Sequence, residues 1–324
     1  MSDKIRVGIL GCANIADRFV IPAFQSSSQF EVIGIASRCP NTAGKFAKKF
    51  CIPAYKDYED LVTSESLDAV YIPLPNSLHF EWVKKALENN LHVLVEKSLA
   101  CTYEDVLCLT NLAESKNLVL LENFQFRFHS QLSYIKSLVL NGEIGDLRNI
   151  RSSFGFPPFK NTENIRYNKS LGGGALLDAG AYPLKIVQMF MGENIYVSSS
   201  CLFVDELYEI DTYGSFQIND PDLKIAAQGA FGFDNFYKCN LELWGSKGVI
   251  QANRIFTSPP GEVSNIDIFS DSGDRSISIP PDDHFKKMLE YFFYLLNNKD
   301  KLEIEYRQNL QQAKLLAEIW DKSE

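Results

Sequence analysis

Small residues follow the first apolar run of the sequence at a spacing that suits a bound pyrophosphate. The pattern G-x-A-x-x-A begins at Gly11, directly after Ile5–Leu10. In this pattern the first residue permits a tight turn, the second lets the main chain approach a phosphate, and the third packs a helix on a strand. Amides at a helix start also attract anions. We therefore predict a dinucleotide site here, with a plain strand-to-helix turn as the alternative. Its contacts are expected from Gly11, Cys12, Ala13, Asn14 and Ile15.

The residues after the second apolar run indicate which dinucleotide binds. NAD-dependent enzymes commonly place an acid at the end of this strand, on a ribose hydroxyl. Here Phe30–Ala36 is followed by Ser37 and Arg38, and a guanidinium pairs well with a ribose phosphate. Glu31 has the sequence distance of a ribose acid but lies at the wrong end of the strand. The pattern favours NADP(H), with NAD(H) as second choice; a solvated Arg38 is the alternative.

Two further loops follow strands of the same series. Pro73, Asn76 and His79 come after the third strand, while Glu96 and Lys97 close the fourth. Ligands of open parallel sheets bind at the carboxyl ends of the strands, so we expect these residues at the cofactor. Lys97 is a candidate acid or base, because burial and nearby charges can move a lysine pKa toward neutrality. The alternatives are a helix cap for Asn76, a surface position for His79 and a structural Glu96–Lys97 pair.

The elements that must position these motifs alternate between strand and helix over the first 120 residues. Apolar, β-branched runs are separated by segments with helical spacing, which predicts parallel strands joined by helices. An open, doubly wound α/β sheet is the commonest such fold. The five expected strands are Ile5–Leu10, Phe30–Ala36, Leu67–Ile72, His92–Glu96 and Leu118–Glu122.

After about residue 125 the pattern changes to strands without intervening helices. Runs of alternating polarity between turn residues from Arg148 to Phe269 predict a large, mostly antiparallel sheet in an α+β domain. Helical segments at 283–321 are expected to close this domain. We therefore predict a nucleotide-binding domain over residues 1–123 and a substrate-binding and oligomerisation domain over residues 124–324.

Composition excludes several classes of protein. The net charge of −9 argues against a nucleic-acid or anionic-membrane partner, and no apolar run approaches the roughly 20 residues of a membrane span. Seven cysteines without CxxC spacing are expected to be reduced thiols in a cytoplasmic protein. With four histidines and no HxxxH, no metal site is predicted.

Four segments in order make the sequence resemble the Gfo/Idh/MocA oxidoreductase family. They read GCANIA, PLPNSLH, EKSLA and LGGGALLDAGAYPL, and the resemblance spans essentially the whole chain. It implies a Rossmann domain and a C-terminal α/β domain whose open sheet often forms a dimer or tetramer interface. The implied chemistry is nicotinamide-dependent oxidation or reduction of sugars, cyclitols and related alcohols.

Two positions depart from the family pattern. The usual E-K-P reads Glu96-Lys97-Ser98, and the usual D-x-x-x-H reads Asp178 to Tyr182. Residues four apart share a helix face, although Pro183 disturbs helix geometry. The tyrosine form resembles sugar-nucleotide 3-ketoreductases and dimeric dihydrodiol dehydrogenases.

The resemblance implies a mechanism for the candidate residues. NADPH would deliver hydride to a sugar ketone in a crevice between the domains. Tyr182 would donate the proton to the ketone oxygen, and Lys97 would supply positive charge beside it. Asp178 would orient Lys97 or bind a hydroxyl group of the sugar. Arg127 aligns with a general family residue, and we assign it to the cofactor. Substrate contacts are expected from His129, Arg166 and Tyr167, whose alternatives are a satisfied interface histidine, a surface cation and packing. The Gly172–Gly174 loop allows close approach or simply starts a helix.

We expect an NADP-dependent reductase of a ketosugar, most simply a nucleotide-linked one. A dehydrogenase of free sugars, cyclitols or trans-dihydrodiols is the second reading. A non-catalytic NADP-binding sensor is the third, although a sensor has no need of the proton donor Tyr182.

Overall fold

The computed structural model describes residues 4–323, which form two compact units. The first unit contains the chain up to Asn123 together with Phe285–Leu310. The second contains Phe124–His284 and the chain from Gln311 onward. Residues 285–310, which the sequence pattern grouped with the second domain, thus belong to the first unit. Residues 1–3 and 324, the outer ends of the two expected domains, lie outside the described part.

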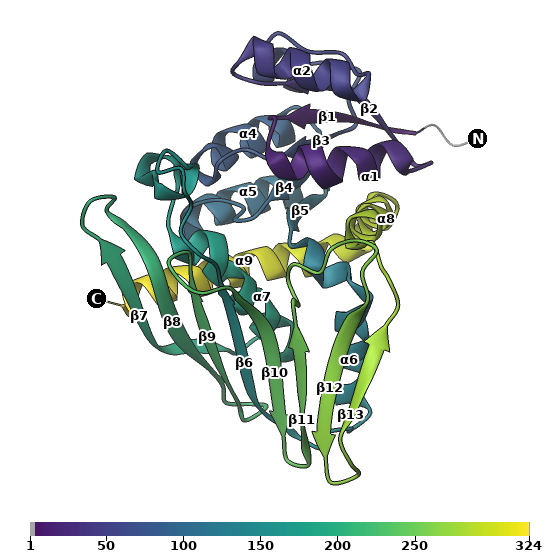
Figure 1. Cartoon of the computed structure of the whole chain (residues 1–324). Helices are drawn as coiled ribbons and strands as arrows, with labels where there is room; N and C mark the ends of the chain where they lie inside the picture. Colours follow the sequence, from purple (N-terminus) through teal and green to yellow (C-terminus); the bar gives the residue numbers. More distant parts are fainter. Residues whose placement is uncertain (1–3, 324) are drawn as a thin grey trace. The chain divides into compact units, whose positions relative to one another are not determined.

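A five-stranded parallel sheet in the order β2-β1-β3-β4-β5 forms the first unit (Figure 1). From β1 the chain turns first to β2 on one side and then to β3 on the other. The carboxyl ends of β1 and β3 therefore flank the point where strand order reverses, the usual ligand position of such sheets. This is the predicted Rossmann architecture. The strands are β1 (Ile5–Leu10), β2 (Phe30–Ala36), β3 (Ala69–Ile72), β4 (His92–Glu96) and β5 (Leu120–Asn123).

Aromatic contacts fasten α8 to this unit. Phe285 stacks on Phe19 with ring centres 4.7 Å apart, and Phe292 stacks on Phe30 at 6.1 Å. The Asn309 amide donates to the Leu120 carbonyl at 3.1 Å, so the first half of α9 holds β5. The helices with residues in this unit are α1 (Ile21–Ser26), α2 (Pro40–Phe50), α3 (Tyr58–Val62), α4 (Asn76–Glu88), α5 (Tyr103–Ser115), α8 (His284–Asn297) and α9 (Leu302–Asp321).

The second unit is built on an eight-stranded sheet in the order β13-β12-β11-β10-β6-β9-β8-β7 (Figure 1). All neighbouring pairs are antiparallel except β6 and β9, which run parallel. The strands are β6 (Leu147–Gly155), β7 (Tyr196–Asp205), β8 (Ile210–Asp220), β9 (Ile225–Gly232), β10 (Lys238–Gly245), β11 (Gly248–Asn253), β12 (Ser264–Ser270) and β13 (Arg275–Ile279).

One face of this sheet is covered and the other is solvated. In β10, for example, Leu241 and Leu243 are buried, whereas Trp244 is exposed. The covering layer includes α6 (Ser130–Leu140) and α7 (Ala181–Phe190). The Gln312 side chain donates to the Ala181 carbonyl at 3.0 Å and ties the second half of α9 to α7.

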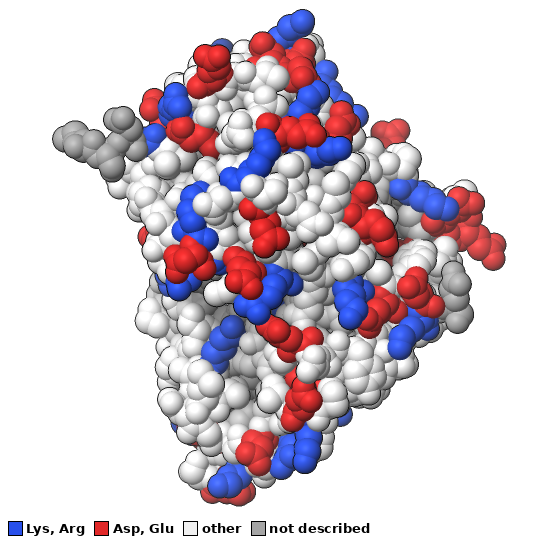
Figure 2. All heavy atoms as spheres, turned by 180° about the vertical axis from the view of Figure 1, so that it is seen from behind, with Lys and Arg blue, Asp and Glu red and all other residues white. Residues whose placement is uncertain are grey.

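Acidic and basic side chains are interspersed on the face seen in Figure 2, and neither sign forms a continuous area there. None of the helices within residues 4–323 is both long and apolar enough to cross a membrane. In the same part of the chain, no group of three or more His, Cys, Asp or Glu residues is arranged to hold a metal ion.

Candidate active site

The loop after β1 has the tight geometry that the sequence predicts. Gly11 has a φ of +124°, and a Cβ at this position would lie 3.3 Å from the Pro73 carbonyl oxygen. The Gly11 amide donates to the Ala36 carbonyl at 3.0 Å, and the helix begins at Asn14. Asn14 is exposed, and Cys12, Ala13 and Ile15 are half-buried. Gly11 itself is buried, and the residues after it are partly or fully exposed at the sheet edge where a phosphate would bind.

The Ser37–Arg38 loop adjoins this turn. The Ser37 hydroxyl accepts the Cys39 amide at 3.3 Å, and Arg38 is exposed after the end of β2. Glu31 pairs in register with Arg6 near the opposite end of the strand, so it lies away from this loop. The predicted phosphate-binding pair is thus placed at the carboxyl edge, and the discounted acid is not.

Tyr58 is a residue of this loop region that sequence reasoning missed. Burial raises the pKa of its phenol, while hydrogen bonds with the Arg38 main chain and the Ser37 side chain oppose that rise. Its ring packs edge-on against Trp82 at 5.1 Å. The available signal was Asp57, whose carboxylate caps α3 by accepting the Asp60 amide at 2.9 Å.

His79 links the loops after β3 and β4. It is fully buried, with Nδ1 2.7 Å from the Ser98 carbonyl and Nε2 2.8 Å from the Leu74 carbonyl. Burial lowers the pKa of this ring to about 4. His79 is therefore no surface histidine, and each of its nitrogens faces a main-chain carbonyl. Asn76 is the first residue of α4, with Pro75 in the cap position, so the helix-cap alternative for Asn76 is wrong.

Glu96 is held by two donors at the end of β4. The Tyr71 hydroxyl and the Asn123 amide both donate to Oε1, at 2.6 and 2.7 Å. Burial raises the pKa of Glu96, opposed by these hydrogen bonds and by the charge of Lys97. Lys97 is half-buried and followed by a cis peptide bond to Ser98. This network fixes the main chain that carries Lys97.

In the second unit, aromatic rings enclose Tyr182. Its ring centre lies between 5.0 and 5.7 Å from the rings of Phe124, Phe126, Phe154 and Phe256. The ring is therefore fixed by packing, and the hydroxyl is its single polar group. Tyr182 is half-buried near the start of α7.

Asp178 lies in the π-helical turn Leu176–Gly180 that leads into α7. Its Oδ2 accepts a hydrogen bond from Arg166 Nε at 2.5 Å. Asp211, on β8, accepts the Leu176 amide at 2.5 Å and so holds the start of the same turn. Burial raises the pKa of Asp211 to about 6. The structure thus brings Arg166, Asp178 and Tyr182 together.

A second π-helical turn, Ala16–Val20, follows the loop after β1. Both turns are followed within three residues by a proline, Pro22 or Pro183. Proline lacks an N–H and clashes with the carbonyl four residues earlier, which a wider turn relieves. This explains how the helix passes Pro183 while it carries both Asp178 and Tyr182.

The other three candidates have structural contacts. His129 caps α6, because its Nδ1 accepts the Gln131 amide at 3.1 Å. Tyr167 accepts the Phe159 amide on its hydroxyl at 3.1 Å and packs against neighbouring rings. Arg127, in the short 3-10 helix Gln125–Phe128, lies over the Phe128 ring at 5.4 Å.

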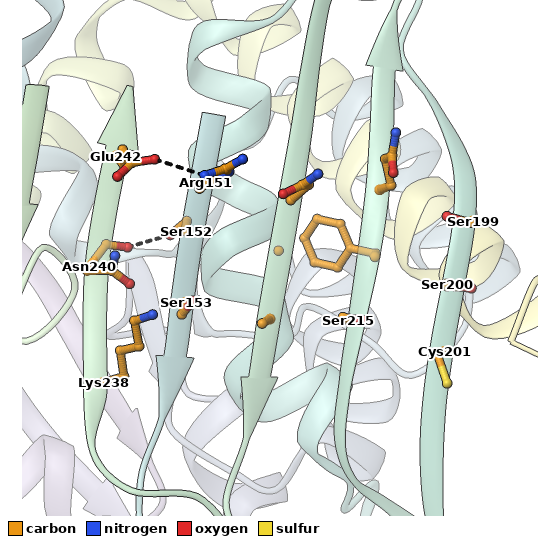
Figure 3. A pocket seen from close by; sticks show the side chains of 15 residues that line it. Arg151, Ser152, Ser153, Ser199, Ser200, Cys201, Ser215, Lys238, Asn240 and Glu242 are labelled. Carbon is orange, nitrogen blue, oxygen red and sulfur yellow. Dashed lines mark hydrogen bonds and ion pairs between the residues drawn. The ribbon is translucent and has the colours of Figure 1, made fainter. Parts of the chain in front are cut away.

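A pocket of about 580 Å³ lies elsewhere, on the strands of the second unit (Figure 3). Polar side chains line it, with Arg151 paired to Glu242 at 3.5 Å and the Ser152 hydroxyl bonded to the Asn240 carbonyl at 2.8 Å. None of the predicted site residues contributes to its lining.

A doubly wound parallel sheet with a phosphate-type turn, and a second unit that presents a fixed tyrosine, define a nicotinamide-dependent oxidoreductase. The family model described as "Oxidoreductase family, NAD-binding Rossmann fold" matches residues 5–124. The model of the "GFO/IDH/MocA C-terminal domain" matches residues 132–251. The chain belongs to the Gfo/Idh/MocA family of oxidoreductases.

Sugar-nucleotide reductases are among its similar proteins. The dTDP-3,4-didehydro-2,6-dideoxy-alpha-D-glucose 3-reductase of Saccharopolyspora spinosa is 38% identical over 90% of this chain and 87% of its own. KijD10, a 3-ketoreductase from Actinomadura kijaniata solved with NADP and TDP-benzene, matches with a TM-score of 0.95 and 32% identity over 99% of this chain and 98% of its own. A trans-1,2-dihydrobenzene-1,2-diol dehydrogenase from Xenopus tropicalis is 34% identical over 57% of each chain.

Proposed function

We propose that this protein reduces the ketone of a nucleotide-linked deoxysugar with NADPH. The observation that carries the proposal is the 38% identity over 90% of the chain to a dTDP-ketosugar 3-reductase. The site supports it, because Tyr182 offers a fixed phenol that can donate the proton and Lys97 an ammonium group that can stabilise the developing negative charge.

NADP(H) is the cofactor that fits the first unit. The turn at Gly11 favours glycine, because its φ is +124° and a Cβ would lie 3.3 Å from the Pro73 carbonyl oxygen; such a turn suits a pyrophosphate cradle. Ser37 and Arg38 supply a hydroxyl and a cation for the ribose phosphate. When bound, the nicotinamide supplies the hydride. The similar 3-ketoreductase KijD10 was solved with NADP, which supports the same choice.

Residues of this chain would then supply the proton that the ketone oxygen gains. As the ketone carbon gains hydride, negative charge grows on its oxygen, and Tyr182 donates its phenolic proton there. Lys97 stabilises that charge most strongly in the transition state. The rings around Tyr182 hold the orientation of its phenol.

NADPH oxidation tests the proposal. Purified protein is mixed with a panel of dTDP-linked 3-ketosugars, free sugars, cyclitols and diketones, and absorbance of NADPH is followed. We expect turnover with a dTDP-linked 3-ketosugar and at least tenfold lower kcat/KM for the free sugar, since the nucleotide provides binding energy. Turnover confined to substrates without a nucleotide would contradict the proposal.

Oxidation of trans-dihydrodiols is the second candidate activity. The 34% identity over 57% of the chain to the Xenopus tropicalis enzyme favours it. The same preparation is assayed with NADP and a trans-dihydrodiol, and faster turnover there than with every ketosugar would make it the better assignment.

We further propose that the chain forms a homo-oligomer through the solvated face of the eight-stranded sheet. Large side chains are exposed on its strands, including Trp244 and Phe203. Light scattering after gel filtration should give a dimer or tetramer, and Trp244→Glu should shift the population toward monomer. A monomer at all concentrations would contradict this.

A further inference from the structure

Arg166 is fixed by its side chain against the helix that carries Tyr182. Its Nε donates to Asp178 Oδ2 at 2.5 Å, and the Asp178 side chain is only 13% exposed. The guanidinium carbon lies 4.9 Å from the centre of the Phe159 ring. A charge-assisted hydrogen bond and a cation–π contact together hold the guanidinium in one position.

The main chain of Arg166 is fixed as well. Its amide donates to the Asn164 side chain at 3.1 Å, and its carbonyl accepts the Gly174 amide at 3.0 Å. A Cβ at Gly173 would lie 2.5 Å from the Arg166 carbonyl oxygen. The Gly172–Gly174 loop therefore permits close approach of the Arg166 segment, one of its two predicted uses.

The Arg166 guanidinium lies against the segment that carries Tyr182, because its partner Asp178 is four residues before Tyr182 in that segment. The charge of Asp178, and to a smaller extent that of Tyr182, raises the pKa of Arg166, while burial opposes the rise. In general, a cation close to a phenol favours the phenolate form of that phenol.

Other charged groups surround the phenol on its neighbouring elements. Asp178 lies on the preceding turn and Asp211 on β8, where the charge of Asp178 contributes to its raised pKa. Lys185 lies on α7 itself, with Nζ 5.0 Å from the Phe124 ring centre. The four packed rings around Tyr182 are uncharged. A negative charge on Asp178 or Asp211 would oppose a phenolate at Tyr182, whereas the positive charge of Arg166 would favour it, as would that of Lys185.

We propose that Arg166, held by Asp178, is a positioning residue that stabilises the phenolate of Tyr182 during proton transfer. This inference rests on the proposed ketone reduction. In that step the ketone carbon gains hydride from NADPH, and the Tyr182 O–H bond breaks as its proton passes to the sugar oxygen. The phenolate and NADP⁺ remain, and the phenolate then takes a proton from water. Arg166 thus acts through Tyr182, whereas the sequence had indicated a substrate contact.

Direct titration of Tyr182 tests the proposal without any substrate. The full-length protein is labelled with ¹³Cζ-tyrosine, and Tyr182→Phe identifies the Tyr182 signal. We expect the titration midpoint to rise by about one pH unit or more in Arg166→Gln, a typical effect of losing a nearby opposite charge. Arg166→Lys should stay close to wild type. An unchanged midpoint in Arg166→Gln would overturn the proposal.

Arg151→Gln is the matched control, because Arg151 is also partly exposed and paired with a carboxylate, Glu242. It should leave the Tyr182 midpoint unchanged. If Arg166→Gln does not fold by circular dichroism, Arg166→Met keeps the length and packing of the side chain and takes its place.

Kinetics separate the two proposals. In Arg166→Gln we expect kcat to fall about tenfold or more at pH 7 with KM changed less, and the alkaline limb of kcat to move to higher pH. Wild type that turns over no ketosugar would contradict the proposed function, while the titration would still decide the role of Arg166. An active wild type with the same pH profile as Arg166→Gln would contradict this inference alone.

Discussion

Tyr182 presents one polar atom from a ring fixed by four phenylalanines. Tyr182→Phe removes that atom and keeps the packing, so the fold should be unaffected. We expect kcat to fall by about a hundredfold or more, as for loss of a general acid, and Lys97→Ala to have a comparable effect. NADPH fluorescence titration should give unchanged affinity in both variants. Near-normal kcat in both would remove the proton-transfer role.

Arg38 is exposed beyond the end of β2, where a ribose phosphate would meet it. Arg38→Ala should raise KM for NADPH by about tenfold or more through loss of a charge-assisted contact, and KM for NADH by much less. Initial rates with each cofactor at saturating substrate measure both values. Equal increases would show that Arg38 does not select the phosphate.

At the scale of elements, Gly173 and Gly44 allow the same substitution, glycine to alanine, to be tested at a crowded and at an open position. A Cβ at Gly173 would lie 2.5 Å from the Arg166 carbonyl, whereas a Cβ at Gly44, within α2, meets nothing within 4 Å. Gly173→Ala should lower stability and kcat, because the Arg166 segment must move. Gly44→Ala should instead raise the free energy of unfolding by roughly 0.5–1 kcal/mol through helix propensity. Urea unfolding measures both; a stabilised, fully active Gly173→Ala would contradict the close approach.

Strands with strong local patterns were predicted well from the sequence. The buried runs of β1, β2 and β4 have the expected ends, because flanking turns and β-branched residues mark them. The short helix α3 was missed, because five residues give no helical period. Strand β13 was missed because its residues are mostly exposed and only pairing with β12 orders them. The parallel β6–β9 pair depends on long connections that carry no local signal.

The candidate site was predictable where motifs are contiguous. Gly11 directly follows β1 and Lys97 directly follows β4, so the local sequence predicts where they lie. The Arg166–Asp178 pair joins the short 3-10 helix Ile165–Tyr167 to a helical turn twelve residues later. Tyr58 reaches Ser37 from another element. Such contacts arise from tertiary packing, and residue type alone gives no warning of them.

At the scale of the whole molecule, buried histidines link stability to pH. Burial lowers the pKa of His79, His92 and His284 to about 4, whereas an unfolded histidine titrates near 6.5. The unfolded chain therefore binds more protons between these values, and stability falls as pH drops from about 6.5 toward 4. Asp211, raised to about 6, and Glu96, also raised, oppose this trend with the opposite sign.

Urea unfolding at several pH values measures the balance. We expect a lower midpoint at pH 5 than at pH 7, since three histidines outnumber the two carboxyl groups. His284→Gln should reduce the pH dependence, because one of the three groups is then absent. A higher midpoint at pH 5 would show that the carboxyl groups dominate.

The return of the chain to the first unit has a consequence for synthesis. Phe19 and Phe30 find their stacking partners in Phe285 and Phe292, which the ribosome makes after the whole eight-stranded sheet. The nascent nucleotide-binding unit must therefore wait with apolar surface uncovered, where other chains or chaperones can reach it. A fragment cut at Asn123 would keep that surface permanently exposed. The unit whose synthesis begins first therefore completes its core only after the second unit has been made.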